Sequence, residues 1–300
     1  MKINVENLKI KFGKQILIGE KLSNYSWFNL GGPADIFFKP NSLESIISFF
    51  DTIKPQKITI IGAGSNTLIR EGGIKGITIK LGTAFSHIKM DSENVIEVGA
   101  ATPDKKVADF AKNNSLTGLE FLACIPGSIG GAIRMNTGCY SEDISQIFHS
   151  IKVIDIKGNL KEILAKDIKF SYRSTNLEEN LLIISIKLIG KHCLKKKIEK
   201  KQKKLIEKKK KSQPSQIKTC GSTFKNPKNK KAWQLIKESN CENFRVGNAK
   251  ISEKHCNFFV NNGNATSKDL EELINKVKET VYKKTKINLE LEIKIIGYNK

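Results

Sequence analysis

Arginine and acidic residues are scarce in this sequence of 300 residues. Lysine and arginine together number 52 against 30 acidic residues, which gives a formal net charge of +22 at pH 7. Only Arg70, Arg134, Arg173 and Arg245 are arginine, so 52 − 4 = 48 of the basic residues are lysine. Such a charge raises nucleic acid as a partner, because phosphates attract basic side chains without regard to sequence. The lysines are spread over the whole chain with no RNA-binding aromatic signature, so nucleic-acid binding stays the weaker alternative.

Long apolar runs are also missing. No stretch approaches the roughly 18 apolar residues that a membrane-spanning helix needs. Residues 1–20 are mixed and charged, without the apolar run of a signal peptide. We therefore expect a soluble, cytoplasmic protein. A hydrophobic content of 39% over this length suffices for two or three packed domains.

The chain has no CxxC motif and no cluster of cysteine with histidine. Its six cysteines lie far apart in the sequence, and its four histidines form no cluster with them at metal-ligand spacing. Zinc sites and disulfide frameworks depend on such spacings. The sequence therefore predicts reduced thiols and no metal site.

Two glycine-rich segments stand out among the residues that are present. Residues 62–67 (GAGSNT) follow a short apolar strand at 57–61, and residues 121–138 (FLACIPGSIGGAIRMNTG) contain four glycines. Two loops with backbone N–H groups and hydroxyls suit a bound diphosphate, although either loop alone reads equally well as a plain turn. A Rossmann site is disfavoured, because Thr67 replaces the third fingerprint glycine and no acidic residue follows at the required spacing.

Together with three further segments, these loops resemble the UDP-N-acetylenolpyruvoylglucosamine reductase (MurB) family. The further segments are residues 26–35 (SWFNLGGPAD), 170–173 (FSYR) and 220–227 (CGSTFKNP). The resemblance spans residues 20 to 297. It implies an α+β fold, with a two-part FAD-binding domain of the PCMH/vanillyl-alcohol-oxidase type followed by a smaller α+β substrate-binding domain. The implied division is a variable lead-in at 1–20, the FAD-binding domain at 21–192, a basic helical connector at 193–214 and the substrate-binding domain at 215–300.

The resemblance also implies an activity. Members of the family reduce UDP-N-acetylglucosamine enolpyruvate to UDP-N-acetylmuramate in peptidoglycan precursor synthesis, with non-covalent FAD and with NADPH as hydride donor. We expect a monomer of the compact type that lacks a substrate-covering insertion, with a small-molecule substrate, no nucleic-acid partner and no membrane insertion. Asn29 departs from the basic residue usual at its position. Another FAD enzyme of the same fold, such as an oxidase, is the second hypothesis.

The site residues carried over from the resemblance fall into three groups. The catalytic residues are Arg173, Ser222 and Glu292, and the substrate-binding residues are Tyr172, Lys225 and Asn226. The cofactor-binding residues are Gly62, Gly64, Ser65, Asn66, Thr67, Pro126, Gly127, Ser128, Ile129, Gly130, Gly131, Asn136 and Gly138.

The chemistry of the reaction explains why the catalytic residue types are needed. Arg173 would clamp the substrate carboxylate bidentately, which lysine cannot do, although a structural ion pair is the alternative. Ser222 would donate a proton to C2, although it could equally be a turn serine after Gly221. Residues 287–295 alternate strictly, so periodicity makes Glu290 and Glu292 equivalent. The family's closing signature selects Glu292, whose pKa should be raised if it is buried.

The rest of the sequence predicts secondary-structure elements and little about function. Residues 1–19 are a lead-in that carries little information. The lysine-rich run at 195–211 reads as a solvated amphipathic helix or, less well, as a nucleic-acid patch, and its end could share in binding the UDP phosphates. We expect a helix that begins with Thr102 as N-cap and Pro103 as its first residue. Further helices are expected at 42–52, 232–239 and 267–282, and strands at 57–61, 74–81, 95–99, 151–156, 160–164, 181–189, 257–260 and 287–295.

Overall fold

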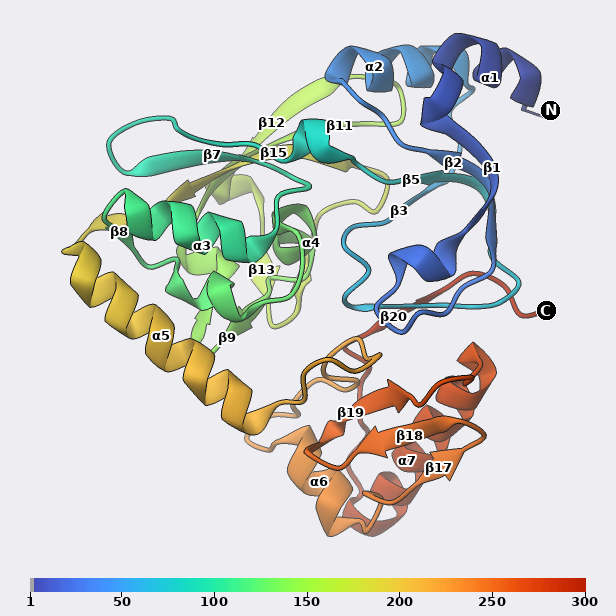
Figure 1. Cartoon of the computed structure of the whole chain (residues 1–300), viewed down its shortest axis with the longest axis vertical. Coiled ribbons are helices and arrows are strands. Elements are labelled where there is room, and N and C mark those ends of the chain that lie inside the picture. Colours follow the sequence, from blue (N-terminus) through green and yellow to red (C-terminus); the bar gives the residue numbers. More distant parts are fainter. Residues whose placement is uncertain (1–2) are drawn as a thin grey trace. The chain divides into compact units, whose positions relative to one another are not determined.

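The computed structural model of the chain describes residues 3–300, and it has the expected α+β content (Figure 1). Its residues form two compact units that alternate along the sequence. The first unit comprises Met1–Ile18, Ile36–Ala63 and Gly76–Lys209, and the second comprises Gly19–Asp35, Gly64–Lys75 and Lys210–Lys300. The chain passes between the units inside three strands, β1 (Ile16–Lys21), β2 (Pro33–Phe38) and β5 (Ile74–Ile79), within the first glycine loop between Ala63 and Gly64, and near the end of a long helix.

A four-stranded sheet in the order β1-β2-β5-β3 begins the fold, with β3 (Ile58–Ile60) parallel to β5. Helices α1 (Val5–Phe12) and α2 (Leu43–Thr52) lie side by side, where Lys11 Nζ donates to Thr52 Oγ1 over 2.8 Å (Figure 1). Leu8 and Phe12 are buried in the core that they share with α2. The lead-in is therefore a structured helix and strand, and its signal was two apolar residues four apart in a charged segment.

The larger sheet of the first unit is antiparallel throughout. Its strand order is β12-β11-β15-β7-β6. The bounds are Ile88–Met90 for β6, Val95–Gly99 for β7, Phe148–Ile154 for β11, Leu160–Leu164 for β12 and Leu182–Ile189 for β15. The structure confirms the expected hairpin, in which Ile154 pairs with Leu160, and the expected buried strand, which is the central β15.

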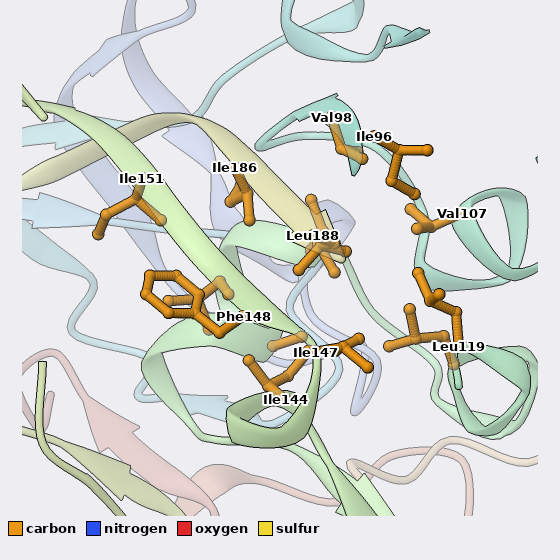
Figure 2. Packing of buried hydrophobic residues seen from close by; sticks show 14 of the residues in the cluster. Ile96, Val98, Val107, Leu119, Ile144, Ile147, Phe148, Ile151, Ile186 and Leu188 are labelled. Atoms are coloured by element: carbon orange, nitrogen blue, oxygen red, sulfur yellow. The ribbon is translucent and has the colours of Figure 1, made fainter. Parts of the chain in front are cut away.

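Apolar side chains from this sheet meet two helices in one core. Figure 2 shows Ile96 and Val98 of β7 beside Val107 of α3 (Asp104–Asn113), with Ile186 and Leu188 of β15 to their left in the same core. The short helix α4 (Ile129–Arg134) contributes to the same core. The expected start of α3 was wrong by one residue. Pro103 is the N-cap in extended backbone, and the Thr102 hydroxyl donates instead to the His87 carbonyl over 3.2 Å.

The lysine-rich segment forms the helix α5 (Lys195–Ser212), as expected. It has one buried row, which includes Ile198 and Gln202. The Gln202 amide donates to Asp109 over 2.9 Å, and Lys201 pairs with the buried carboxylate of Glu120 over 3.1 Å. The helix is thus amphipathic, although its inner face is held by polar bonds as well as by apolar packing.

The second unit packs two helices on a small antiparallel sheet. The sheet order is β17-β18-β19, with bounds Arg245–Val246, Ala249–Ser252 and His255–Asn261. The helices are α6 (Ala232–Glu238) and α7 (Ser267–Thr285). Thr266 and Asp269 form a reciprocal capping box that starts α7. All five residues predicted to face inward on α7 are buried, namely Leu270, Leu273, Ile274, Val277 and Val281.

The long strand expected at residues 287–295 was wrong. Only β20 (Lys294–Ile296) is a strand, and it pairs in parallel with β4 (Thr67–Ile69). Before it, Leu291 makes an isolated bridge with Phe224. Leu289 and Ile293 are the fully buried side chains of this segment. Apolar and polar residues do alternate here, but no neighbouring strand lies along the whole segment to supply the hydrogen bonds of a ladder.

Short elements complete the chain. Two-residue strands pair as β8 (Leu116–Thr117) with β16 (Lys191–His192), β9 (Gly138–Cys139) with β10 (Glu142–Asp143), and β13 (Phe170–Ser171) with β14 (Ser174–Thr175). All six cysteines are free thiols. Across residues 3–300 no helix has the length and apolar character to cross a bilayer, and the same residues contain no cluster of three potential metal ligands.

Candidate active site

The Ser222 segment runs beside the segment that carries Glu292. Gly221 turns the chain with a φ of +79°, which favours glycine. Ser222 then bridges Phe258 of β19. The Glu292 N–H donates to the Thr223 carbonyl over 2.9 Å, and the Lys225 N–H donates to the Glu290 carbonyl over 2.8 Å. Main-chain pairing therefore brings the expected proton donor and the expected carboxyl residue into neighbouring positions.

Exposure separates the two glutamates that periodicity left equivalent. The Glu290 side chain is 77% exposed, and its carboxylate lies 3.6 Å from Lys225 Nζ. Glu292 is half-buried. The two side chains thus lie in different surroundings, and only that of Glu292 is partly withdrawn from solvent.

Asn66 links the first glycine loop to Glu292. Its amide nitrogen donates to the Glu292 carbonyl over 3.0 Å, and its own carbonyl accepts the Lys294 N–H over 2.9 Å. Gly64 of the same loop has a φ of +70°, and a side chain there would collide with the Tyr25 carbonyl. Thr67 begins β4, and its carbonyl accepts from the Ser26 hydroxyl over 3.1 Å. In the structure this part of the loop, which includes Ser65, belongs to the second unit.

The second glycine loop is held by main-chain bonds within the first unit. The Gly127 carbonyl accepts the Asp104 N–H, and the Ile129 N–H donates to the Thr102 carbonyl over 2.9 Å. Ser128 bridges Pro103, next to Pro126 and Gly127. These bonds fix the course of the loop from residue 126 to the start of α4.

Gly62 and Gly131 meet at Ser128. A Cβ built on Gly62 would lie 3.3 Å from Ser128 Oγ, and one on Gly131 would lie 3.7 Å from it. Apart from the chain neighbours and the backbone of α4 itself, no other described atom lies within 4 Å of either position. Gly130 differs, because its Cβ would lie 3.0 Å from Ala100. Packing against Ala100 therefore accounts for Gly130. At Gly62 the close atom is a single hydroxyl oxygen, and at Gly131 the contact is an ordinary one, so these two positions can admit the close approach of a cofactor.

Lys80 is a residue near this loop that the sequence analysis missed. Its ammonium group donates to the Gly62 carbonyl. Burial lowers its pKa, and the nearby charge of Lys39 lowers it further. Two cations thus lie near the first glycine loop. Nothing in the sequence distinguishes Lys80 among 48 lysines.

Arg173 lies in the tight turn between β13 and β14. Its φ of +57° is in the left-handed region, which costs a non-glycine residue about 1–3 kcal/mol. The guanidinium donates to the Gly138 carbonyl over 2.7 Å and stacks 5.0 Å from the ring centre of Tyr172, which is half-exposed. Asn136 supports the same turn, because its amide donates to the Ser171 carbonyl over 3.0 Å. The structure brings Arg173, Tyr172, Asn136 and Gly138 together.

Asn226 and Lys225 follow the Ser222 segment. The Asn226 side-chain oxygen accepts the N–H of Ala232, the first residue of α6, over 3.0 Å. The structure therefore gives Asn226 a local role at a helix start, and its expected contact with substrate stays a prediction. The expected residues fall into two groups, one in each unit, with Arg173 in the first and Ser222 and Glu292 in the second.

Comparison with known proteins identifies the family. A model of the C-terminal domain of UDP-N-acetylenolpyruvoylglucosamine reductase matches residues 213–296, and an FAD-binding domain model matches residues 34–163. The chain is 46% identical over 279 residues to the UDP-N-acetylenolpyruvoylglucosamine reductase of Pelagibacter ubique, covering 92% of each chain. It is 41% identical to that of Rickettsia canadensis, covering 92% of this chain and 94% of the relative.

Among solved structures, that of the MurB reductase from Thermus caldophilus matches with a TM-score of 0.83 and 29% identity. The match covers 94% of this chain and all of the other. It agrees with the α+β fold described above and extends over both units. The chain belongs to the UDP-N-acetylenolpyruvoylglucosamine reductase (MurB) family, and the resemblance found in its motifs is confirmed.

Proposed function

We propose that this oxidoreductase converts UDP-N-acetylglucosamine enolpyruvate to UDP-N-acetylmuramate, with bound FAD and with NADPH as the hydride donor. It would do so as a cytoplasmic monomer in peptidoglycan precursor synthesis. Family membership and the matching FAD-binding domain support the cofactor and the substrate class. We further propose that the FAD-binding domain covers residues 21–192 and the substrate-binding domain residues 215–300, on either side of the connector at 193–214.

The observation that carries the proposal is the pairing of the Ser222 segment with the Glu292 segment. The reaction adds hydride to C3 of the enolpyruvyl double bond and a proton to C2. A hydroxyl and a carboxyl group carried on two paired segments suit the second addition, because one can donate the proton while the other orients it. The 2.9 Å bond from the Glu292 N–H to the Thr223 carbonyl fixes their relative register.

The residues of the first unit fit a bound flavin. Gly62, Gly131 and Ser128 leave room beside the second loop, and Lys80 supplies positive charge near Gly62. FAD, when bound, supplies hydride taken from NADPH. The remaining loop residues, from Gly64 to Thr67 and from Pro126 to Gly130, would shape the cradle around it together with Asn136 and Gly138.

The other side chains would bind the substrate and stabilise charge. Arg173 would hold the carboxylate, where negative charge grows once hydride reaches C3. Ser222 would release its proton to C2, which is basic at that moment. Glu292 would orient the proton transfer, while Tyr172, Lys225 and Asn226 would contact the rest of the substrate. An apolar side chain at any of these positions would remove a charge or a donor.

The test is the variant Ser222→Ala, followed anaerobically by the visible spectrum of the flavin. We expect reduction by NADPH to stay near the wild-type rate, while reoxidation by the enolpyruvyl ether slows by about 10²–10⁴-fold, since only that half-reaction needs the proton. Thr223→Val is the matched control. It removes the neighbouring hydroxyl, which is buried and has no hydrogen-bond partner among residues 3–300, so both half-reactions should persist.

Three results would contradict the proposal. Equal loss in both half-reactions would make Ser222 a residue for folding or FAD binding. A wild-type protein that NADPH bleaches and only oxygen recolours would favour an oxidase. A colourless protein that cannot be reconstituted with FAD and is retained on DNA in a salt-sensitive way would favour a nucleic-acid-binding protein.

A further inference from the structure

The Ser222 segment is held by few main-chain bonds. It belongs to no strand, and it makes isolated bridges at Ser222 and Phe224. On its N-terminal side Gly221 has a positive φ, and apart from its chain neighbours no described atom lies within 4 Å of the position of its missing Cβ. Cys220, just before it, is 2% exposed, and its thiol donates to the Gly64 and Thr67 carbonyls. Gly221 therefore separates Ser222 from that anchor, and the remaining contacts that determine where the hydroxyl lies come from the residues that follow it.

Asn257 of β19 makes most of those contacts. Its side-chain oxygen accepts the Phe224 N–H over 3.0 Å, and its amide nitrogen donates to the Phe224 carbonyl over 2.8 Å. Its own main-chain carbonyl accepts the Thr223 N–H over 2.8 Å. One side chain thus satisfies both backbone groups of Phe224, in the way that a neighbouring strand would. Asn257 is only 3% exposed, so water cannot replace it.

The same short segment also carries the contact to Glu292. The Thr223 carbonyl accepts the Glu292 N–H, while the Thr223 N–H donates to Asn257. The backbone at Thr223 and Phe224 therefore forms a strip between two partners. Asn257 anchors it on one side, and Glu292 is bonded to it on the other. A shift of this strip would move Ser222 and change its distance to Glu292 at once.

We propose that Asn257 is a positioning residue that holds the Ser222 hydroxyl in reach of C2. The inference rests on the proposed function. Asparagine suits the position because it offers one acceptor and one donor in a single plane. Aspartate offers only acceptors when ionised, and alanine offers neither group. Asn257 has no proposed contact with the substrate, and its effect passes entirely through Ser222.

The same strand provides a matched control, Asn261. It is 4% exposed, its amide nitrogen donates to the Phe28 carbonyl over 2.8 Å, and its side-chain oxygen accepts the Ala265 N–H over 3.1 Å. Its side chain too is bonded to main-chain groups, one in each of two neighbouring loops. None of the proposed catalytic residues lies on the loops that it fastens. Replacing Asn261 therefore reproduces the structural loss without the proposed catalytic loss.

The experiment compares Asn257→Ala with Asn261→Ala in full-length, FAD-loaded protein. We expect both variants to melt at lower temperature. For Asn257→Ala, anaerobic reoxidation by the enolpyruvyl ether should slow by about 100-fold, as misplacement of a reacting group by about 1 Å does. Its reduction by NADPH should stay within about twofold of wild type, because that half-reaction does not use the Ser222 proton. Both half-reactions of Asn261→Ala should also stay within about twofold, because Asn261 positions no reacting group.

Asn257→Asp provides a second measurement, which also decides the matter if Asn257→Ala does not fold. The aspartate keeps the acceptor for the Phe224 N–H but loses the donor to its carbonyl until the carboxyl group is protonated. Its reoxidation rate, relative to wild type, should therefore recover as pH falls. The same ratio for Asn261→Asp should stay flat.

Several outcomes would overturn the inference, and they can be told apart. Equal slowing of reoxidation in the Asn257 and Asn261 variants, or no slowing in either, would show that Asn257 is only structural while leaving the proposed function intact. A normal Ser222→Ala variant would remove the group that Asn257 is said to position. A wild-type protein that the enolpyruvyl ether does not reoxidise would overturn the proposed function and this inference with it.

Discussion

Glycine stands at different positions of the two loops for different physical reasons. A side chain at Gly64 or Gly138 would collide with main-chain carbonyls, those of Tyr25 and Glu142 respectively. At Gly131 a Cβ would lie 3.7 Å from Ser128 Oγ, which is an ordinary contact distance. The protein by itself therefore tolerates a side chain at Gly131. If glycine is needed there, the need comes from the cofactor.

This difference makes Gly131→Ala informative. Gly131 lies inside α4, where alanine is favoured over glycine by about 1 kcal/mol, so the FAD-free variant should melt slightly above the wild type. The affinity for FAD should nevertheless fall, because the added methyl group occupies space that we assign to the cofactor. Calorimetric titration of FAD into the apoprotein, together with a melting curve, measures both effects. Unchanged FAD affinity would remove Gly131 from the proposed cradle.

Side-chain surroundings at single residues could be predicted only in part. Arg70, one of the four arginines, uses several donors of its guanidinium at once, with two bonds to Glu271, over 2.8 and 2.7 Å, and one to the Gly297 carbonyl. The strained backbone of Arg173 and the placement of Asn257 gave no sequence signal. Backbone strain and buried amide contacts arise from neighbours that are distant in sequence.

The β11–β12 hairpin is an element that its own turn residues stabilise. The Asp155 carboxylate accepts the Lys157 and Asn159 N–H groups over 2.9 and 3.0 Å, and Lys161 lies 3.2 Å from it. Burial opposes ionisation, but the hydrogen bonds from Asn159 and Lys157 and the contact with Lys161 outweigh it and lower the pKa of Asp155 to about 2. The charged form is thus the one that the folded hairpin favours.

A pH-dependent contribution to stability follows from this pKa. The pKa is lower in the folded than in the unfolded protein, so the stabilisation is complete above about pH 5 and disappears as pH falls towards about 2. Because the turn is near solvent, we expect the contribution to be about 1 kcal/mol. Denaturant unfolding of wild type and Asp155→Ala should differ by that amount at neutral pH and converge as pH falls to about 2 and below. A difference that does not change with pH would contradict this origin.

At the scale of elements, apolar periodicity predicted helices and strands correctly where the element has a clear period of its own. The inward residues of α7 and the buried β15 were identified because helix and strand periods need no knowledge of partners. The strand predicted for residues 287–295 was wrong for the opposite reason. Alternation suits a strand, but a strand exists only where another backbone pairs with it, and this segment finds one only at its end.

The whole molecule is divided differently from the order of the sequence. The second unit joins residues 210–300 to two short segments from the N-terminal quarter of the chain. Phe28 and Leu68 from those segments are buried among C-terminal side chains. β20 finds its partner in β4, and Arg70 holds Glu271 of α7. The C-terminal segment therefore lacks part of its core and one strand of a pair when taken alone.

A fragment of residues 213–300 tests this division. We expect it to show no cooperative thermal unfolding, because removing large buried side chains such as Phe28 and Leu68 costs about 3–5 kcal/mol each, against a total of about 5–15 kcal/mol for a typical domain. Circular dichroism during heating, with the full chain as control, measures the transition. A sharp transition in the fragment would show that residues 213–300 fold without the two N-terminal segments.

The sequence by itself determined the family, the α+β class and most of the regular elements, since these depend on short motifs and local periods. Only the tertiary structure decided how exposed Glu290 and Glu292 are, which glycines are packed and which are open, and what holds the Ser222 segment. Each of these depends on residues that the fold brings together from distant positions, as when Asn257 and Glu292 meet the backbone of Thr223 from two sides. Periodicity describes one segment at a time, whereas burial and hydrogen bonding belong to pairs of segments.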